Sequence, residues 1–272
     1  MDPGTGLTIL GSAIGGAKLV EKLLGPTADY VGVGLRNWAE KRVLNVGRIF
    51  EKAARKLGDK IDIPGSVPPR VLKEILDEGS YCDDELTAEY FGGVLASSRS
   101  GTSRDDRAAS YLKLTSELSS YQIRFHYITY TVCRSLFLGS GLRPTFEEDL
   151  NKMWLFLPGS FLSPAMDFTD AEPAQDIILH CTSGLGRHDL IRQAHWGRPD
   201  HVNPLNNQKG WCEVSEWGLT VEPTQFGIDY WLWAVGLGTV NRMRFLENDI
   251  AIPKLPDISV PTGAIKLVSN GK

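Results

Sequence analysis

The stretch from residue 63 to residue 98 constrains the fold of this chain more than any other part of the sequence. It begins with three prolines and a glycine between residues 64 and 69, continues with a strongly acidic region and ends in small residues. Proline fixes φ and disrupts a helix interior, so this group predicts an extended linker, with one of its last two prolines opening a helix. Asp83 or Asp84 is then expected to cap a second helix, because a carboxylate accepts hydrogen bonds from the free N–H groups of a first turn. This capping explains the acidic turn without a catalytic pair of carboxylates.

Two neighbouring blocks of opposite charge lie on either side of this linker. Residues 36 to 60 hold eight basic and three acidic side chains, whereas residues 70 to 89 hold two basic and seven acidic side chains. The blocks could attract one another within the fold, or the basic block could meet nucleic acid or an anionic membrane. The interpretation that the sequence favours is the simplest one, in which both blocks are solvated helix faces.

The N-terminal part is predicted to be a separate amphipathic, basic helical segment over residues 1–62. A glycine-weakened helix is expected over residues 7–24, and its apolar run is shorter than the roughly 20 residues that span a bilayer. A second helix is expected over residues 29–57, ended by Gly58, with its basic side chains largely off an apolar stripe. The residues that we predict to contact a membrane or a partner are Leu7, Leu10, Ile14, Trp38, Arg48, Lys52 and Arg55.

No motif of enzymatic catalysis is found in the sequence. It lacks the GxSxG turn, the GxxxxGK[ST] phosphate loop and the HExxH zinc motif. The four cysteines form no CxxC pair and the histidines form no close HxxxH pair, so we expect no catalytic residues, no metal site and no cofactor. The start of the chain lacks the basic region of a signal peptide. We therefore expect a cytoplasmic protein, with peripheral contact to the inner membrane as an option.

The C-terminal half is predicted to contain a winged-helix-like β-hairpin. From residue 176 the pattern suggests a helix, a second helix, a two-stranded wing and a closing helix that Pro223-Thr224 opens. In such a fold the second helix, over residues 186–193, would present Arg187 and Arg192 to a DNA groove. Two arginines are few for a DNA footprint and this half is nearly balanced in charge, so DNA binding is the less favoured alternative.

Tryptophan is concentrated in the last third of the chain. Five of the seven tryptophans lie there, namely Trp196, Trp211, Trp217, Trp231 and Trp233. Most are expected in the hydrophobic core, but tryptophan is also frequent at the centre of binding interfaces. Some of them are therefore candidate anchors for a partner.

The helical unit around residues 63 to 98 resembles the Abi-alpha (abortive infection alpha) family of bacterial proteins. The residues that carry this resemblance are Pro68, Pro69, Ile75, Leu76, Asp83, Asp84, Glu85, Leu86, Phe91, Val94, Leu95, Ala96 and Ser97. In the C-terminal half they are Leu185, Leu190, Ile191, Leu219, Thr220, Gly227 and Tyr230, with departures at His188 and before Gly227. The resemblance implies a mainly α-helical, multi-helix bundle with a small winged-helix-like β-hairpin, made of the segment 1–62 and a core over residues 63–272.

The resemblance also implies a non-enzymatic anti-phage protein of the abortive-infection type, in which infection leads to arrest or death of the host cell. The charge blocks suggest a mechanism: the helices of residues 7–24 and 29–57 are held against the acidic face of residues 74–89, and a phage signal releases them to a membrane. The expected partners are an unidentified phage or host protein that acts as the trigger, a membrane surface and a second copy of the chain. The alternatives are a winged-helix regulator that binds nucleic acid and a protein-interaction scaffold.

Overall fold

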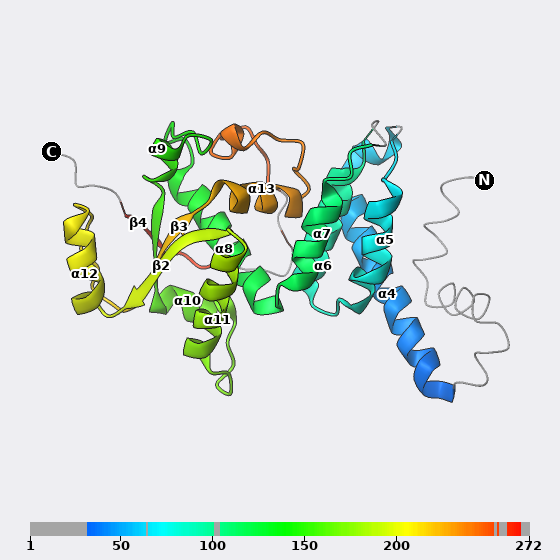
Figure 1. Cartoon of the computed structure of the whole chain (residues 1–272), viewed down its shortest axis with the longest axis horizontal. Coiled ribbons are helices and arrows are strands. Elements are labelled where there is room, and N and C mark those ends of the chain that lie inside the picture. The colour runs from blue at the N-terminus through cyan, green and yellow to red at the C-terminus, as the bar shows by residue number, and fades with distance from the viewer. Residues whose placement is uncertain (1–31, 64, 101–103, 253–254, 256–259, 268–272) are drawn as a thin grey trace. The chain divides into compact units, whose positions relative to one another are not determined.

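The computed structural model describes residues 32–63, 65–100, 104–252, 255 and 260–267, with backbone only for residues 32–39. The chain forms two compact units, which are described separately below (Figure 1). Unit 1 comprises the chain up to Glu117 together with Trp233–Leu237, and unit 2 comprises Leu118–Leu232 and the residues from Gly238 onward. The predicted boundary between residues 62 and 63 lies inside unit 1, because the helix before it packs against helices after it. The division of the chain is therefore corrected to Glu117/Leu118.

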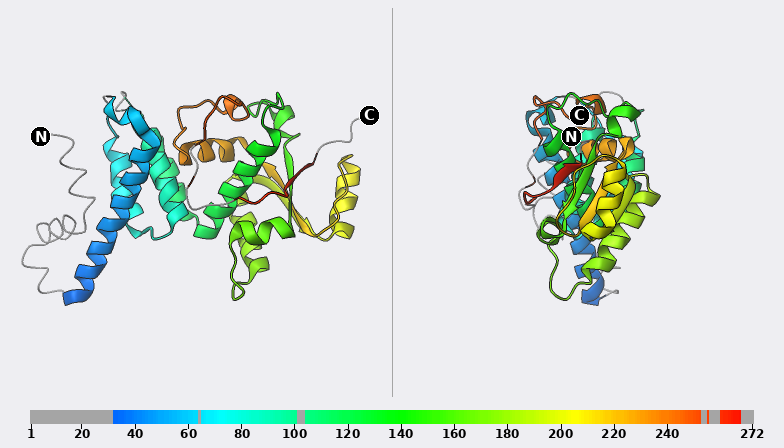
Figure 2. Two further views of the ribbon diagram at one scale, coloured as in Figure 1. Left: turned by 180° about the vertical axis from the view of Figure 1, so that it is seen from behind. Right: turned by 90° about the vertical axis from the view of Figure 1, so that its left-hand side faces the viewer.

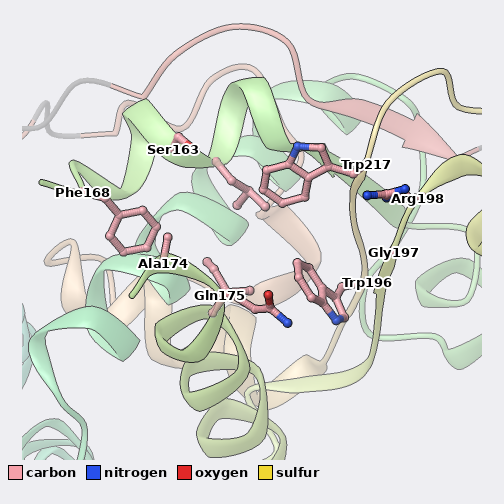
Figure 3. Close-up of a pocket in the computed structure, with 10 residues that line it drawn as sticks. Ser163, Phe168, Ala174, Gln175, Trp196, Gly197, Arg198 and Trp217 are labelled. Atoms are coloured by element: carbon pink, nitrogen blue, oxygen red, sulfur yellow. The ribbon is translucent and has the colours of Figure 1, made fainter. Parts of the chain in front are cut away.

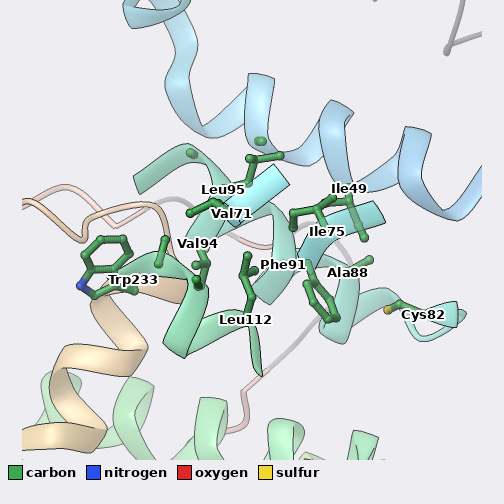
Figure 4. Packing of buried hydrophobic residues seen from close by; sticks show 14 of the residues in the cluster. Ile49, Val71, Ile75, Cys82, Ala88, Phe91, Val94, Leu95, Leu112 and Trp233 are labelled. Atoms are coloured by element: carbon green, nitrogen blue, oxygen red, sulfur yellow. The ribbon is translucent and has the colours of Figure 1, made fainter. Parts of the chain in front are cut away.

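Unit 1 is built from helices, as predicted. Its described elements are α4 (Gly32–Leu57), the 3₁₀ turn η1 (Gly58–Asp62), α5 (Pro69–Asp77), the 3₁₀ turn η2 (Gly79–Tyr81), α6 (Glu85–Ser98) and α7 (Ala108–Glu117). Helix α6 runs through the middle, and α4, α5 and α7 pack around it (Figure 4). Its residues are buried almost without exception, which explains why it is apolar on every side.

The helix boundaries of unit 1 follow from the local sequence. Helix α4 ends where Gly58 takes a left-handed conformation with φ of 50°. Helix α5 begins at Pro69, whose missing N–H costs nothing at the first helical position. Asp84 caps α6, since its carboxylate accepts a hydrogen bond of 2.7 Å from the backbone N–H of Thr87. The predicted glycine stop, proline entry and aspartate cap are confirmed.

A distant segment completes the core of unit 1. Trp233, near the end of α13 (Gln225–Ala234), stacks on Tyr111 of α7 with ring centroids 5.0 Å apart. The Ser97 hydroxyl of α6 donates a hydrogen bond of 3.1 Å to the carbonyl of Trp233, across 136 residues of sequence. The backbone fits because Gly93 has no Cβ, which would lie 1.6 Å from the carbonyl oxygen of Ala234. One of the clustered tryptophans is thereby confirmed as a core residue.

Unit 2 combines helices with a small sheet. Its described elements are α8 (Ser120–Phe137), α9 (Glu147–Leu150), β1 (Trp154–Pro158), α10 (Gly159–Met166), α11 (Ala174–Arg187), β2 (Ile191–Gly197), α12 (Pro199–Gln208), β3 (Gly218–Pro223), the first part of α13, the 3₁₀ turn η3 (Arg242–Arg244) and β4 (Ile265–Leu267). The strands form one antiparallel sheet in the order β2-β3-β1-β4. Figure 2 shows this unit from behind, with α8 in front of the strands, two of which (β3 and β4) it contacts.

Helix α8 organises unit 2. Ser119 caps it in a capping box with Gln122. From the helix interior the hydroxyl of Tyr130 donates a hydrogen bond of 2.5 Å to the carbonyl of Leu190 and accepts one of 3.0 Å from the N–H of Thr224. This buried hydroxyl therefore links the entry to β2 with the exit from β3. The Thr224 hydroxyl in turn caps α13, which begins directly after the predicted Pro223-Thr224, although Pro223 itself is the last residue of β3.

The predicted winged-helix arrangement is not found in full. The prediction of a second helix over residues 186–193 is wrong. Helix α11 ends at Arg187, and Asp189 takes a left-handed conformation with φ of 55°. The chain then continues as β2. β2 pairs with β3, but α12 lies between them, so the pair is not a simple hairpin. β1, which the sequence analysis missed, is buried at every position and lies between β3 and β4. A mostly helical fold with a four-stranded antiparallel sheet is what the structure confirms.

Helices α4 and α6 approach so closely that a side chain at Gly92 has no room. A Cβ at that position would lie 2.7 Å from the Cβ of Lys52 and 3.1 Å from the carbonyl oxygen of Ile49. We expect Gly92→Ala to lower the free energy of unfolding by about 1–3 kcal/mol because the helices must move apart. The measurement is chemical denaturation followed by circular dichroism.

Gly186→Ala is the matched control for that substitution. Gly186 lies near the end of α11 with nothing within 4 Å of an added Cβ, so alanine is expected to stabilise the helix by about 0.5–1 kcal/mol. A Gly92→Ala protein as stable as the unmodified one would contradict the close packing of α4 on α6.

Candidate functional site

A carboxylate inside unit 1 joins three basic side chains of α4. Glu89 of α6 accepts a hydrogen bond of 2.9 Å from Lys52 and one of 2.6 Å from Arg55, and it also pairs with Lys56. Glu85, one turn earlier on α6, pairs with Lys52 and lies 3.7 Å from a guanidinium nitrogen of Arg48. We call these six side chains, Arg48, Lys52, Arg55, Lys56, Glu85 and Glu89, the charge latch.

The centre of the charge latch is withdrawn from water. Only 6% of the Lys52 side chain, 2% of Lys56 and 3% of Glu89 are exposed, whereas Arg55 and Glu85 lie about half exposed at the edge. Charges buried to this extent are tolerated only when they are paired and hydrogen-bonded. Removal of either partner would leave the other one as an uncompensated buried charge.

The pKa values reflect this competition between burial and pairing. Burial alone would raise the pKa of the Glu89 carboxyl, but the charges and hydrogen bonds of Lys56 and Lys52 outweigh burial and hold that pKa below its usual value. Burial lowers the pKa of the Lys56 ammonium, and the charge of Glu89 offsets only part of that effect. Glu89 therefore stays ionised at neutral pH.

The sequence spacing places these groups opposite one another. Lys52 and Lys56 are four residues apart on α4, and Glu85 and Glu89 are four residues apart on α6, so each pair occupies one helix face. The close crossing at Gly92 brings the two faces within hydrogen-bond distance. A matching i,i+4 pair of lysines and i,i+4 pair of glutamates is the signal in the sequence that would have identified Lys56, which the prediction omitted.

Polar contacts extend the interface to the earlier part of α4. Asn45, which is buried, donates a hydrogen bond of 2.9 Å to the carbonyl of Ser80. Arg42 donates one of 2.9 Å to the hydroxyl of Ser80 and places its guanidinium 4.0 Å from the centre of the Tyr81 ring. Lys41 pairs with Asp83 at 3.2 Å on the exposed rim. The basic and acidic blocks thus meet along the described part of α4 from Lys41 onward.

The residues predicted to contact a membrane or a partner fall into three groups in the structure. Arg48, Lys52 and Arg55 lie in the charge latch against α6. The interpretation of both charge blocks as solvated helix faces is therefore wrong, and Lys52 lies on the buried face rather than off it, because Glu89 compensates its charge there. Trp38 lies within α4, but its side chain is outside the described part of the chain. Leu7, Leu10 and Ile14 are also outside the described residues.

The predicted nucleic-acid residues are not brought together on a helix. Arg192 lies in β2 and pairs at 2.9 Å with Glu222 of β3 and at 2.5 Å with Glu147 of α9. Arg187 is the last residue of α11 and is exposed. Since one guanidinium is held by two carboxylates and the expected recognition helix is a strand, the predicted DNA-reading geometry is absent from this part of the chain.

The described ranges contain His, Cys, Asp and Glu side chains, the residue types that bind metals or act in catalysis. No cluster of three or more His, Cys, Asp or Glu side chains there is arranged to hold a metal ion. The four cysteines are all unbonded, and three of them are buried. Burial raises the pKa of the Cys82 and Cys181 thiols to about 12, which keeps them protonated and unreactive.

Comparisons with known proteins do not add an assignment. No protein-family model matches the chain, and no match was found among curated proteins or among solved structures. Among the described helices none has the length and apolarity needed to cross a membrane.

The charge latch makes a direct prediction for stability. We expect Glu89→Gln to lower the free energy of unfolding by about 3–5 kcal/mol, because Lys52 and Lys56 are left buried without a counter-charge. Asp83→Asn removes a carboxylate of the same charge block whose pair with Lys41 is exposed, and it should leave stability unchanged within error. Equal effects of the two substitutions in urea denaturation would contradict the buried role of Glu89.

The cost of Glu89→Gln is expected to depend on pH. Because the pKa of Glu89 is lowered in the folded protein, its stabilising charge is fully present above the unfolded pKa of about 4.3 and is lost as the pH falls through the folded pKa. Glutamine carries no charge at any pH, so the difference between the two proteins should shrink below about pH 4.3. Urea denaturation at a series of pH values measures it. A difference that grows on acidification would show that Glu89 is not ionised in the fold.

Proposed function

We propose that this chain is a non-enzymatic anti-phage protein of the abortive-infection type, in which the charge latch holds α4 against α6 until infection releases it to the bacterial membrane. The observation that carries the proposal is the pairing of Lys52 and Lys56 with Glu89 inside unit 1. The defence role comes from the resemblance to the Abi-alpha family, and the latch supplies a resting state for it.

The packing of α4 on α6 keeps the resting state populated. Separation of α4 from α6 exposes the apolar residues Val46, Ile49 and Ala53 and breaks a buried ion cluster. Burial of a valine or isoleucine side chain contributes about 1.5–3 kcal/mol, so Val46 and Ile49 together keep the released fraction below about one percent. A trigger must therefore supply binding energy that favours the released state.

The released face of α4 has the composition of a membrane-surface helix. Val46, Ile49 and Ala53 share that face with Lys52 and Lys56, so apolar side chains can enter the interface while ammonium groups meet anionic headgroups. The preceding residues 7–24 are apolar and glycine-rich in sequence. The same lysines thus pair with carboxylates at rest and with lipid phosphates after release.

The alternative functions have less support. A winged-helix regulator that binds nucleic acid would need Arg192, which is paired with Glu147 and Glu222 instead. A protein-interaction scaffold remains the second candidate, since α4 released to a partner protein would expose the same face. Vesicle binding distinguishes it from the membrane proposal.

The test compares two variants of the latch in a phage-infected host. Removal of residues 1 to 60 is unsuitable, because α4 covers the central helix of unit 1. An apolar variant with Lys52→Met, Lys56→Met and Glu89→Leu replaces the buried ions by packed apolar groups, a change that is often neutral or stabilising. It should fold, hold α4 in place and fail to protect. Glu89→Gln should instead weaken the latch, raise binding to phosphatidylglycerol vesicles by about tenfold or more and arrest uninfected cells.

Phage plating, survival of infected cells and vesicle cosedimentation are measured for each protein. Protection by the unmodified chain with arrest of infected cells, and none by the apolar variant, is the expected result. Protection by a folded apolar variant equal to that of the unmodified chain would overturn the latch mechanism. An unmodified chain that protects against no phage of the panel would contradict the defence role itself.

A further inference from the structure

Unit 2 contains an aromatic cavity that neither the charge latch nor the predicted DNA surface uses. Its volume is about 510 Å³, within the range of about 300–1,000 Å³ that small-molecule sites occupy. It lies between α10, the start of α11 and the end of β2 (Figure 3). The apolar lining consists of Leu162, Phe168, Ala174, Ile178, Trp196 and Trp217, and the polar side chains are Ser163, Gln175 and Arg198.

Trp217 is held in the wall of this cavity by its backbone and by a glycine. Its carbonyl accepts a hydrogen bond of 2.8 Å from the N–H of Gly159, and a Cβ on Gly159 would lie 2.0 Å from the indole ring. The loop before it is fixed as well, because Glu216 accepts hydrogen bonds from the backbone and hydroxyl of Ser160. Yet 41% of Trp217 remains exposed. A large aromatic side chain that is held in one position but remains exposed to solvent is typical of a binding surface rather than of a hydrophobic core.

A second indole completes the wall. Trp196, in β2, meets Trp217 edge-on with ring centroids 6.0 Å apart and an interplanar angle of 85°. Figure 3 shows these two rings on one side of the cavity and Phe168 on the other. Three aromatic rings around a space of this size favour a flat aromatic guest, because its face or edge can meet each of them.

The charge of the lining is positive. Of the described residues that line the cavity, Arg198 alone is charged, and no carboxylate of the described chain lies within ion-pairing distance of its guanidinium. Arg198 is exposed at the rim of the cavity, where a guanidinium can bind a phosphate or carboxylate group through paired hydrogen bonds. The guest that satisfies the rings and the guanidinium together is a planar aromatic molecule with an anionic group.

We propose that the cavity of unit 2 is a binding site for a small aromatic anion of nucleotide size, in which the rings of Trp196, Trp217 and Phe168 receive the base and Arg198 receives the phosphate. The volume accommodates a single base with its sugar and phosphate. The proposal does not depend on the defence role, since it concerns residues of unit 2 alone.

Isothermal titration of the full chain with the four ribonucleoside 5′-monophosphates tests the site, with the four nucleosides and inorganic phosphate as matched probes. At least one monophosphate is expected to bind with one-to-one stoichiometry. Its nucleoside, which lacks the anion, should bind about tenfold more weakly, and phosphate, which lacks the ring, should not bind measurably.

Two single substitutions separate the roles of ring and charge. Trp217→Ala removes an exposed side chain and should abolish binding of the monophosphate while circular dichroism stays unchanged. Arg198→Gln should reduce binding of the monophosphate to the level of the nucleoside and leave nucleoside binding unaltered. Arg187→Gln, at an exposed arginine of the same unit outside the cavity lining, is the control and should bind normally. Absence of binding by all four monophosphates at millimolar concentration, or binding that persists in Trp217→Ala, would overturn the proposal.

Discussion

The ionised carboxylate of Glu89 is the group on which the arrangement of unit 1 depends. Helix α4 presents Lys52 and Lys56 on the face that packs against α6, and these ammonium groups can be buried there only beside a counter-charge. Such a cluster adds little net stability, because desolvation offsets most of the Coulomb attraction. Its effect is on the register of the helices: a slip of α4 along α6 would leave buried charges unpaired. Gly92 permits the contact by letting the two main chains come close.

In unit 2, buried polar side chains of α8 bond to neutral backbone groups. Tyr130 bonds to the backbone at Leu190 and Thr224, and Arg134 of α8 donates hydrogen bonds of 2.8 and 2.9 Å to the carbonyls of Glu247 and Ile250. Burial raises the pKa of the Tyr130 hydroxyl, so it stays protonated and remains a hydrogen-bond donor. These hydrogen bonds fix segments without regular structure in place. An aromatic cavity lies beside α11 in the same unit. The two units therefore offer sites of different chemistry, a charged helix interface and an aromatic pocket.

The physical difference between these sites bears on what each can do. A buried ion cluster has two discrete states, paired or broken, because partial separation in a medium of low polarity is costly. The charge latch is therefore suited to a two-state transition that needs the binding energy of a trigger. The aromatic cavity is preformed, with its indoles fixed by backbone contacts, so a guest can bind without rearrangement of the fold. The first property underlies the proposed release of α4, and the second underlies the proposed nucleotide-sized ligand.

The sequence by itself determined the local structure: Gly58, Pro69 and Asp84 act through bonds within a few residues, and their helix boundaries were predicted correctly. It also marked the two charge blocks, but not that they pair, since this depends on how closely α4 and α6 cross. Residues 186–193 were taken for a helix because pairing of β2 with β3 is non-local. The cavity shows the same limit: Trp196, Trp217 and Arg198 are present in the sequence, but only the packing of β2 against α11 and β3 decided that they line one space. Short-range hydrogen bonds are encoded locally, whereas burial of a charge or a ring is set by residues far away in the chain.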